Sequence, residues 1–544
     1  GFNSLQVAME RPPALKAIVS IYATDDRYSD DVHYEGGARR QLDFVDYCTY
    51  MAPMNALPPV PRIYGEGWRD VWRERFETTE PWMLRWLEEQ VYGPYWQHGS
   101  LNTNYSAIEA ATMIVAGWAD GYRNCALRTF ENLDCPKRVL FGPWPHASTE
   151  SGLPGPHIDL VPEMLRWWDR WLRDERNGVD EEPPITLFVR RSTRPEPDLA
   201  EMRGEWRFED GWPLERGREK SSALDSATRV PGGEVDELVV RGDVGWSAHL
   251  SCAGVMPWGQ PMDQRIDDAY SLTYDWDPLV EELELLGAPR LEVTVAADKP
   301  VAFLSAKLCD VFEDGTSALV SRGFLNLAQR DSRSDPAPLE PGHRYRVTVP
   351  LSTTSWIYEP GHRVRLSIAG ADWPNVWPPP EPVTLQVVPA ESTLVLPVPD
   401  PPEENRPSPQ LRPPPAERGD ADSTTKAVDS DSRVEWRTDR DILGRKTHVV
   451  VDHGSSYDLE VGGRMTEAYY GKVTASSIDP GDAAAESRVR FHIEWPEATV
   501  ASEVHCSLES DKDNYLLDLR LETFENGELQ WQRRWERTIP RRLQ

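Results

Sequence analysis

The chain has 544 residues, of which 39% are hydrophobic and 27% are charged. This length exceeds what one hydrophobic core usually holds, since a domain typically takes about 150 residues. The 90 acidic and 59 basic side chains give a net charge of -31, a field that repels nucleic-acid phosphates and anionic lipid headgroups. No apolar run approaches the ~18 residues that a membrane span needs. We therefore expect a soluble multi-domain protein that binds neither nucleic acid nor membranes.

Six cysteines are spread along the chain without a CxxC pair or a metal-like spacing with histidine, which predicts no metal site. Such sparse thiols are typical of a reducing compartment and favour the cytoplasm, while a disulfide between Cys125 and Cys135 stays open. Because the sequence begins at Gly1, a signal peptide upstream would lie outside it. Oligomeric state is equally open, and a homo-oligomer is compatible with the sequence.

The first elements in chain order indicate an α/β unit. Residues 2–10 carry Leu5, Ala8 and Met9 at helical spacing and are followed by two prolines, which predicts a short helix. Residues 15–23 are a β-branched apolar run, typical of a strand buried on both faces of a parallel sheet. A helix followed by a strand is half of a βαβ unit, and the strand that should precede this half is absent from the sequence.

Amphipathic stretches rich in tryptophan follow from residue 37 to residue 105, and we interpret them as a helical cap. Strands are then predicted at 112–118 and 137–144, each followed by a helix, the second at 162–174. Strands that alternate with helices indicate a parallel sheet flanked by helices.

Beyond about residue 183, short alternating runs separated by Gly, Pro and Asp are typical of a β-sandwich or jelly roll. A proline-dense run then favours an extended linker, and the final stretch again predicts strands, which we expect to form an antiparallel sheet packed on the sandwich. The predicted domains are a partial α/β domain (1–36 and 106–190), a helical cap (37–105), a jelly roll (191–396), a Pro-rich linker (397–429) and a C-terminal β-rich domain (430–544).

Two predicted strand ends carry the residues of chemical interest. Asp120 follows one strand in GWADGY, and His146 follows the next strand in FGPWPH. Because the C-terminal ends of parallel strands meet at one edge of an open sheet, we expect these side chains within hydrogen-bonding distance. The carboxylate would fix the tautomer of the imidazole, which could then take a proton from a nucleophilic hydroxyl. Taken alone, two such loop residues more often have a structural role.

Three stretches carry a resemblance to a known family: GFNSLQVAMERPPALKAIVSIYATDDRYSDDVHYEGG, GWADGY and FGPWPH. They resemble the cocaine-esterase and X-prolyl dipeptidyl-peptidase serine hydrolases, whose acid lies in a G-W-x-D-G motif and whose histidine lies in a G-P-W-x-H motif, matching Asp120 and His146. The β region carries two motifs that are similar to that family's jelly roll, L-x-D-V-x-x-D-G and x-P-G-H-R-x-R. The resemblance therefore covers about residues 1–400. It implies α/β plus all-β architecture: a partial α/β-hydrolase sheet with a helical cap, a jelly-roll β-sandwich and a further β-rich C-terminal domain.

The resemblance also implies a function. Family members cleave ester, amide or X-Pro peptide bonds of small molecules or short peptides through an acyl-enzyme intermediate, with a Ser-Asp-His triad and neither metal nor organic cofactor. Their nucleophile lies in a G-x-S-x-G-G elbow just before the helix that begins here at Phe2, so we expect the serine upstream of Gly1. Ser4, Ser247 and Ser317 lack such an elbow. We therefore expect the chain alone to be inactive.

Two other interpretations stay open. One is a non-catalytic protein whose β domains bind carbohydrate or protein beside a relic hydrolase portion, and the other is an acylase of amino-acid esters or β-lactams on the same scaffold. Three aromatic residues flank the acid and the histidine and are predicted to contact substrate: Trp118, Tyr122 and Trp144. Tyr122 is the strongest of these predictions because it lies on the loop after the acid, whereas core packing is equally expected for the two tryptophans.

An acidic cluster follows the first predicted strand: Asp25, Asp26, Asp30, Asp31 and Glu35. It could receive a substrate ammonium group, but a solvated, strand-capping loop is the favoured interpretation. His33 and His157 lie near the same strand ends and outside the family motifs, so surface or helix-start roles are favoured for both.

Overall fold

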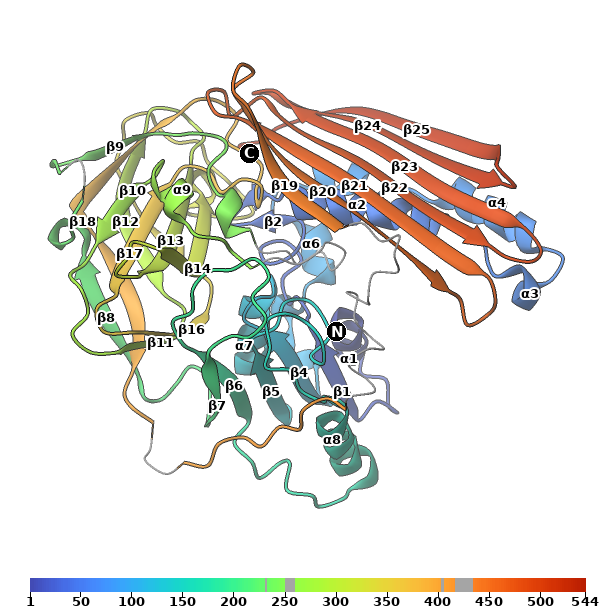
Figure 1. Ribbon diagram of the computed structural model, residues 1–544, viewed down its shortest axis with the longest axis horizontal. Coiled ribbons are helices and arrows are strands. Elements are labelled where there is room, and N and C mark those ends of the chain that lie inside the picture. The colour runs from blue at the N-terminus through green and yellow to red at the C-terminus, as the bar shows by residue number, and fades with distance from the viewer. Residues whose placement is uncertain (230–231, 250–259, 403–405, 416–433) are drawn as a thin grey trace.

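The structure is a computed structural model that describes residues 1–229, 232–249, 260–402, 406–415 and 434–544. It contains an α/β sheet with helices on both faces, a helical cap, a β-sandwich and a long C-terminal sheet (Figure 1). The predicted combination of an α/β region with large β-rich domains is confirmed. Within the described ranges, every helix is too short or too polar to cross a membrane.

The α/β sheet has five strands in the order β1-β4-β5-β6-β7. Its first four strands are parallel and β7 is antiparallel to β6, so the sheet continues past residue 190, where the sequence predicted its end. Helices α1 and α7 pack on one face and α8 packs on the other, which explains the apolar strands. The bounds are β1 Ala17–Ile21, β4 Ala111–Gly117, β5 Lys137–Gly142, β6 Ile185–Arg190, β7 Gly204–Glu209, α1 Phe2–Met9, α7 Arg123–Asn132 and α8 Val161–Arg173.

The segment between β1 and β4 forms the cap. Two of its helices begin at Pro61 and Pro94, where the missing N–H of proline costs no hydrogen bond. The indoles of Trp72, Trp86 and Trp96 are buried, so the tryptophan-rich stretches pack into a core. The elements are β2 Tyr34–Glu35, β3 Ala38–Arg39, α2 Leu42–Asn55, α3 Pro61–Tyr64, α4 Trp68–Thr78, α5 Trp82–Glu88, α6 Pro94–Gly99, η1 Leu101–Thr103 and η2 Tyr105–Ala107.

The sandwich packs a β10-β17-β13-β14 sheet against a β15-β12-β18-β8 sheet that β9 extends. The separate pair β11 and β16 lies beside β6, where the Ser192 N–H donates to the Ile357 carbonyl. The sandwich therefore docks on the edge of the α/β sheet. Its elements are β8 Gly217–Ala223, η3 Leu224–Ser226, β9 Asp236–Val239, η4 Trp246–Ala248, α9 Arg265–Asp268, β10 Leu272–Asp275, β11 Leu283–Gly287, β12 Arg290–Ala297, β13 Phe303–Val311, β14 Ser317–Asn326, η5 Leu327–Gln329, β15 Tyr345–Pro350, β16 Thr354–Tyr358, β17 Arg363–Ala369 and β18 Thr384–Pro399.

The C-terminal sheet is a seven-stranded antiparallel meander in chain order. It packs mainly on helix α2 of the cap (Figure 1), where Phe44 and Cys48 share a core with Val504 and Leu519. The expectation that this sheet packs on the sandwich is therefore wrong in its main contact, because apolar side chains of α2 pack into the core of the sheet. The strands are β19 Val434–Asp441, β20 Lys446–Asp458, β21 Arg464–Ser476, β22 Ala483–Glu494, β23 Thr499–Ser510, β24 Asn514–Glu525 and β25 Glu528–Pro540.

The described part of the Pro-rich segment runs along the surface of the α/β domain (Figure 1). Leu411 joins the core beneath α8, and the Asp159 N–H donates to the Arg412 carbonyl at 2.8 Å. This segment connects the sandwich with the C-terminal sheet and also covers part of the α/β domain.

The described cysteines are free thiols. Cys125 and Cys135, the pair that the sequence left open, do not form a disulfide. Burial raises the pKa of both thiols, so neither has the thiolate character of a reactive cysteine at neutral pH.

Candidate active site

The loops after β4 and β5 lie against each other at one edge of the α/β sheet. Gly117 pairs with Gly142 at the ends of these strands, and the Ala119 N–H donates to the Trp144 carbonyl at 3.1 Å. A Cβ at Gly117 would fall 2.0 Å from that carbonyl oxygen, so only glycine allows the two loops to approach this closely. The main chain thereby holds the residues that follow both strands next to each other.

Asp120 and His146 are brought together by these loops. The Nδ1 atom of His146 lies 3.2 Å from Oδ1 of Asp120. The carboxylate is fully buried, whereas 26% of the imidazole side chain is exposed. This arrangement places the Nδ1 proton on the side of the acid and leaves Nε2 to exchange a proton with a reacting group.

Two tyrosine rings flank the imidazole. The ring centroid of Tyr22 lies 5.1 Å from that of His146, and the Tyr122 ring lies edge-on at 5.3 Å. The hydroxyl of Tyr122 donates to Oδ1 of Asp31 at 3.2 Å, which fixes its ring. The prediction that Tyr122 lies beside the histidine is therefore met in geometry, and its contact with substrate stays a prediction.

Tyr22 is a site residue that the sequence interpretation missed. It follows β1 directly, adopts a positive φ of 50° and donates its N–H to the Val115 carbonyl at 2.9 Å. Burial and then the charge of Asp120 raise the pKa of its hydroxyl well above the usual range. The position of Tyr22 directly after β1 could have identified it from the sequence, because β1 neighbours β4 and ends at the same edge of the sheet.

The two tryptophans predicted to contact substrate lie in the core. Trp118 is 1% exposed and its Nε1 donates to the Phe188 carbonyl at 2.7 Å. Trp144 is also buried, and its Nε1 donates to the Pro156 carbonyl at 2.9 Å. These hydrogen bonds tie the indoles to the scaffold around the site, while their contact with substrate stays a prediction.

The acidic cluster after β1 is buried or half-buried and paired with arginines, so the expectation of a solvated loop is wrong. Each of its carboxylates has at least one arginine partner: Asp25 and Asp30 pair with Arg128, Asp26 with Arg333, Asp31 with Arg27, and Glu35 with Arg40 and Arg322. Burial raises the pKa of Glu35, but Arg322 and Arg40 outweigh it and hold the pKa at about 2. The cluster therefore acts as a set of structural ion pairs.

The two off-motif histidines have structural contacts. His33 is fully buried against Trp86 and Trp96 of the cap, so its predicted surface role is wrong. Burial lowers its pKa well below the usual range, which keeps its imidazole neutral. A ring nitrogen of His157 contacts the Gly152 carbonyl at 3.1 Å in the loop before α8, a place that agrees with the predicted helix-start role.

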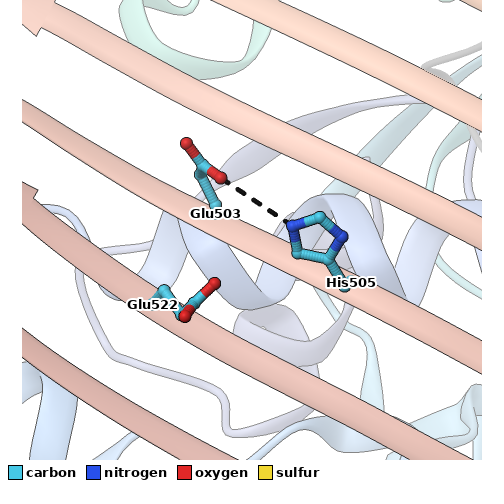
Figure 2. Close-up of side chains that lie close together, drawn as sticks. All are labelled: Glu503, His505 and Glu522. Atoms are coloured by element: carbon cyan, nitrogen blue, oxygen red, sulfur yellow. Dashed lines mark ion pairs between the residues drawn. The ribbon is translucent and has the colours of Figure 1, made fainter. Parts of the chain in front are cut away.

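Three side chains with metal-binding groups lie close together on the C-terminal sheet, on the face opposite α2: Glu503, His505 and Glu522 (Figure 2). Alternation along β23 turns Glu503 and His505 away from the buried Val504. Glu503 already pairs with Arg490 and Glu522 with Arg520. Because arginines occupy both carboxylates, we assign no metal to this cluster.

Comparisons with known proteins bear on the family of the chain. The profile of the X-Pro dipeptidyl-peptidase (S15) family matches residues 1–148, and the profile of the X-Pro dipeptidyl-peptidase C-terminal non-catalytic domain matches residues 177–408. Cocaine esterase of Rhodococcus sp. (strain MB1 Bresler) is 26% identical over 313 residues, which are 51% of this chain and 52% of the esterase. The chain thus spans about half the length of the curated relatives it matches.

Solved structures share the fold. A CocE/NonD family hydrolase from Staphylococcus aureus superposes with a TM-score of 0.53 and 13% identity over 73% of this chain and 70% of the other. An alpha-amino acid ester hydrolase gives a TM-score of 0.54 and 19% identity over 73% and 75% of the two chains. The chain belongs to the cocaine-esterase and X-prolyl dipeptidyl-peptidase family of hydrolases.

Proposed function

We propose that Asp120 and His146 are the acid and the general base of a serine hydrolase that cleaves carboxylic esters or amides. The observation that carries this proposal is the 3.2 Å contact between Nδ1 of His146 and the buried carboxylate of Asp120. The carboxylate orients the ring and stabilises the imidazolium that forms when Nε2 takes the proton of a nucleophile. The imidazolium then returns this proton to the leaving group.

The nucleophile in this proposal is a serine carried by residues that precede Gly1. Among the described residues, no hydroxyl hydrogen-bonds to Nε2 of His146. The hydroxyls of Ser4 and Ser247 donate instead to the Gly1 carbonyl and to Asp267. Gly1 lies against Ile21 at the end of β1, so a segment joined to it would start at the edge of the sheet that carries the histidine. The 544-residue chain alone is then expected to hydrolyse esters no faster than a variant without His146.

Labelling with a fluorophosphonate tests this proposal, because the probe reacts only with an activated hydroxyl. A longer protein that includes the residues before Gly1 should be labelled, and its His146→Ala variant should lose the label because the triad acts as a unit. The 544-residue chain should remain unlabelled and show no burst with a p-nitrophenyl ester. Equal labelling of the longer protein and its His146→Ala variant would refute the base, and a burst from the short chain would refute the upstream nucleophile.

The substrate class within this proposal is a small ester, an amide or a short X-Pro peptide. Support comes from the relatives, among which are a cocaine esterase and an alpha-amino acid ester hydrolase. Parallel assays of the longer protein with a p-nitrophenyl ester and with an X-Pro p-nitroanilide compare the two activities by kcat/KM.

A further inference from the structure

A cavity lies between the α/β sheet and the sandwich. Its volume is about 50 Å³, which is about the space of three or four water molecules. The loop after β4 contributes Trp118 to its wall, the start of α7 contributes Arg123, the end of β6 contributes Arg190, and β16 of the sandwich contributes Trp356. The cavity is therefore lined by three arginines and two tryptophans from both domains, and the third arginine, Arg194, pairs with Asp314.

Arg190 is held rigidly in this wall, with 8% of the residue exposed. Its Nε donates to the Ser355 carbonyl at 3.1 Å, and its Nη2 donates to Oγ1 of Thr354 at 2.7 Å. The guanidinium carbon lies 5.5 Å from the ring centroid of Trp118 and 5.4 Å from that of Trp356, within the range of a cation–π contact. All of these partners are uncharged.

Arg123 is the second cation of the wall and is 7% exposed. Its Nη1 makes one long hydrogen bond, of 3.4 Å, to the Asp120 carbonyl. The charge of Arg123 lowers the pKa of Arg190 after burial itself, so the two guanidinium groups repel each other. Burial and then the charge of Arg322 lower the pKa of Arg123, whereas the negative charges of Glu35 and Asp120 raise it.

Neither guanidinium has a carboxylate at ion-pair distance in the part of the chain that the structure describes. Glu196 at the cavity wall is exposed and pairs with neither of them. The buried Arg322, in contrast, pairs with both Glu35 and Asp372.

Both groups keep their charge at neutral pH, because burial lowers their pKa only to about 9 for Arg190 and to about 10 for Arg123. Glu35 and Asp120 offset part of the charge of Arg123, but only Arg123 acts electrostatically on Arg190. An uncompensated buried positive charge raises the free energy of the folded state unless an anion lies with it. The cavity therefore has the charge, the space and the donors to hold one small anion.

We propose that this cavity binds a small oxyanion, a carboxylate or a phosphate, between Arg190 and Arg123. A planar guanidinium presents parallel N–H groups that match two oxygens of either anion. The bound anion offsets the charge of the two arginines and links the start of α7, which follows the loop of Asp120, to β6 and to the sandwich. This inference does not rest on a catalytic role of His146.

Thermal unfolding of the 544-residue chain tests the site. The midpoint is measured at pH 7 in rising sodium acetate, phosphate or chloride, with total ionic strength kept constant. The midpoint of the wild type should rise with the logarithm of the acetate or phosphate concentration above Kd, by about 3 °C at 100 times Kd. Arg190→Gln should lose this rise. Arg346→Gln is the matched control and should keep it, because Arg346 is 73% exposed on β15.

The outcomes separate the ligands. A midpoint that begins to rise at a lower concentration of acetate than of phosphate identifies a carboxylate site, and the reverse order identifies a phosphate site. An equal rise in all three proteins, a rise with chloride alone or no rise in the wild type would overturn the proposal. If Arg190→Gln does not fold, Arg123→Gln takes its place. Binding is then read directly from the broadening of the ¹³C resonance of acetate. Broadening by the wild type that Arg123→Gln abolishes supports the site, and equal broadening by both refutes it.

Discussion

The carboxylate of Asp25 and the guanidinium of Arg128 form a two-point ion pair that joins the loop after β1 to helix α7. Nε of Arg128 donates to Oδ2 of Asp25 at 2.8 Å, and Nη2 donates to Oδ1. Arg128 also reaches Asp30 at 2.9 Å. The same loop carries Asp31, the acceptor of the Tyr122 hydroxyl, so these ion pairs fix the wall of the candidate site.

Arg128→Ala is expected to lower the free energy of unfolding by about 2–3 kcal/mol, because it leaves the fully buried charge of Asp25 without its cation. We expect less than the cost of a wholly buried pair because 35% of the Arg128 side chain is exposed. Arg73→Ala, which breaks an exposed pair with Glu77 on α4, is the control and should change stability little. Urea denaturation measures the free energy of unfolding of both variants. Equal losses would show that the pair of Asp25 and Arg128 stabilises the fold no more than an exposed ion pair.

Tyr22→Phe is expected to keep the stability of the wild type or to raise the free energy of unfolding by up to about 1 kcal/mol. The Tyr22 hydroxyl is buried and has no hydrogen-bond partner among the described residues, and removing such a group removes its desolvation cost. Tyr22→Ala also removes the ring beside His146 and should cost about 2–3 kcal/mol. If Tyr22→Phe proves as destabilising as Tyr22→Ala, the hydroxyl must have a partner and the prediction fails.

Asp120→Asn tests the proposed acid. An amide at this position favours the wrong tautomer of His146, so kcat for a p-nitrophenyl ester should fall about 10³–10⁴-fold with little change in KM. The assay uses the longer protein that carries the proposed nucleophile. Asp134→Asn, at an exposed position after α7, should keep wild-type kcat. Unchanged kcat in Asp120→Asn would remove Asp120 from the mechanism.

The sequence predicted the contact between Asp120 and His146 because this contact follows from a local rule. Residues after neighbouring parallel strands meet at one edge of the sheet, and Asp120 and His146 each follow such a strand. The same rule applies to Tyr22, but applying it requires knowledge of the strand order β1-β4-β5, which no local sequence pattern reveals. Its positive φ is likewise set by the surrounding structure and not by the preference of tyrosine.

The remaining errors concern partners that are distant in the sequence. The acidic loop after β1 has the composition of a solvated loop, and the arginines that bury it include Arg322 and Arg333 from the sandwich. Periodicity likewise identifies apolar faces on α2 and on the C-terminal strands, but it does not say which faces meet. Such contacts depend on tertiary packing, which a single sequence does not encode in a readable pattern.

The interface between α2 and the C-terminal sheet contains a buried carboxyl group, Asp46, beside the Tyr469 hydroxyl. Burial raises the pKa of Asp46 well above its usual range. The folded protein therefore holds this proton more tightly than the unfolded chain. The resulting stabilisation is fully present below the unfolded pKa of about 4 and is lost as the pH rises through the folded pKa.

Asp46→Asn should remove this pH dependence, because an amide of the same shape does not ionise. We expect the variant to be more stable than the wild type at pH 8. The gain should be about 1.4 kcal/mol for each unit by which the folded pKa of Asp46 exceeds its unfolded pKa, counted only up to pH 8. Thermal unfolding midpoints at pH 5 and pH 8 measure the difference, with the exposed Asp458→Asn as the control on the same sheet. The wild type and the control should lose stability between the two pH values more steeply than Asp46→Asn. Parallel pH profiles for all three proteins would contradict this prediction. They would mean that Asp46 is ionised in the folded state and that another group at the interface between α2 and the C-terminal sheet compensates its charge.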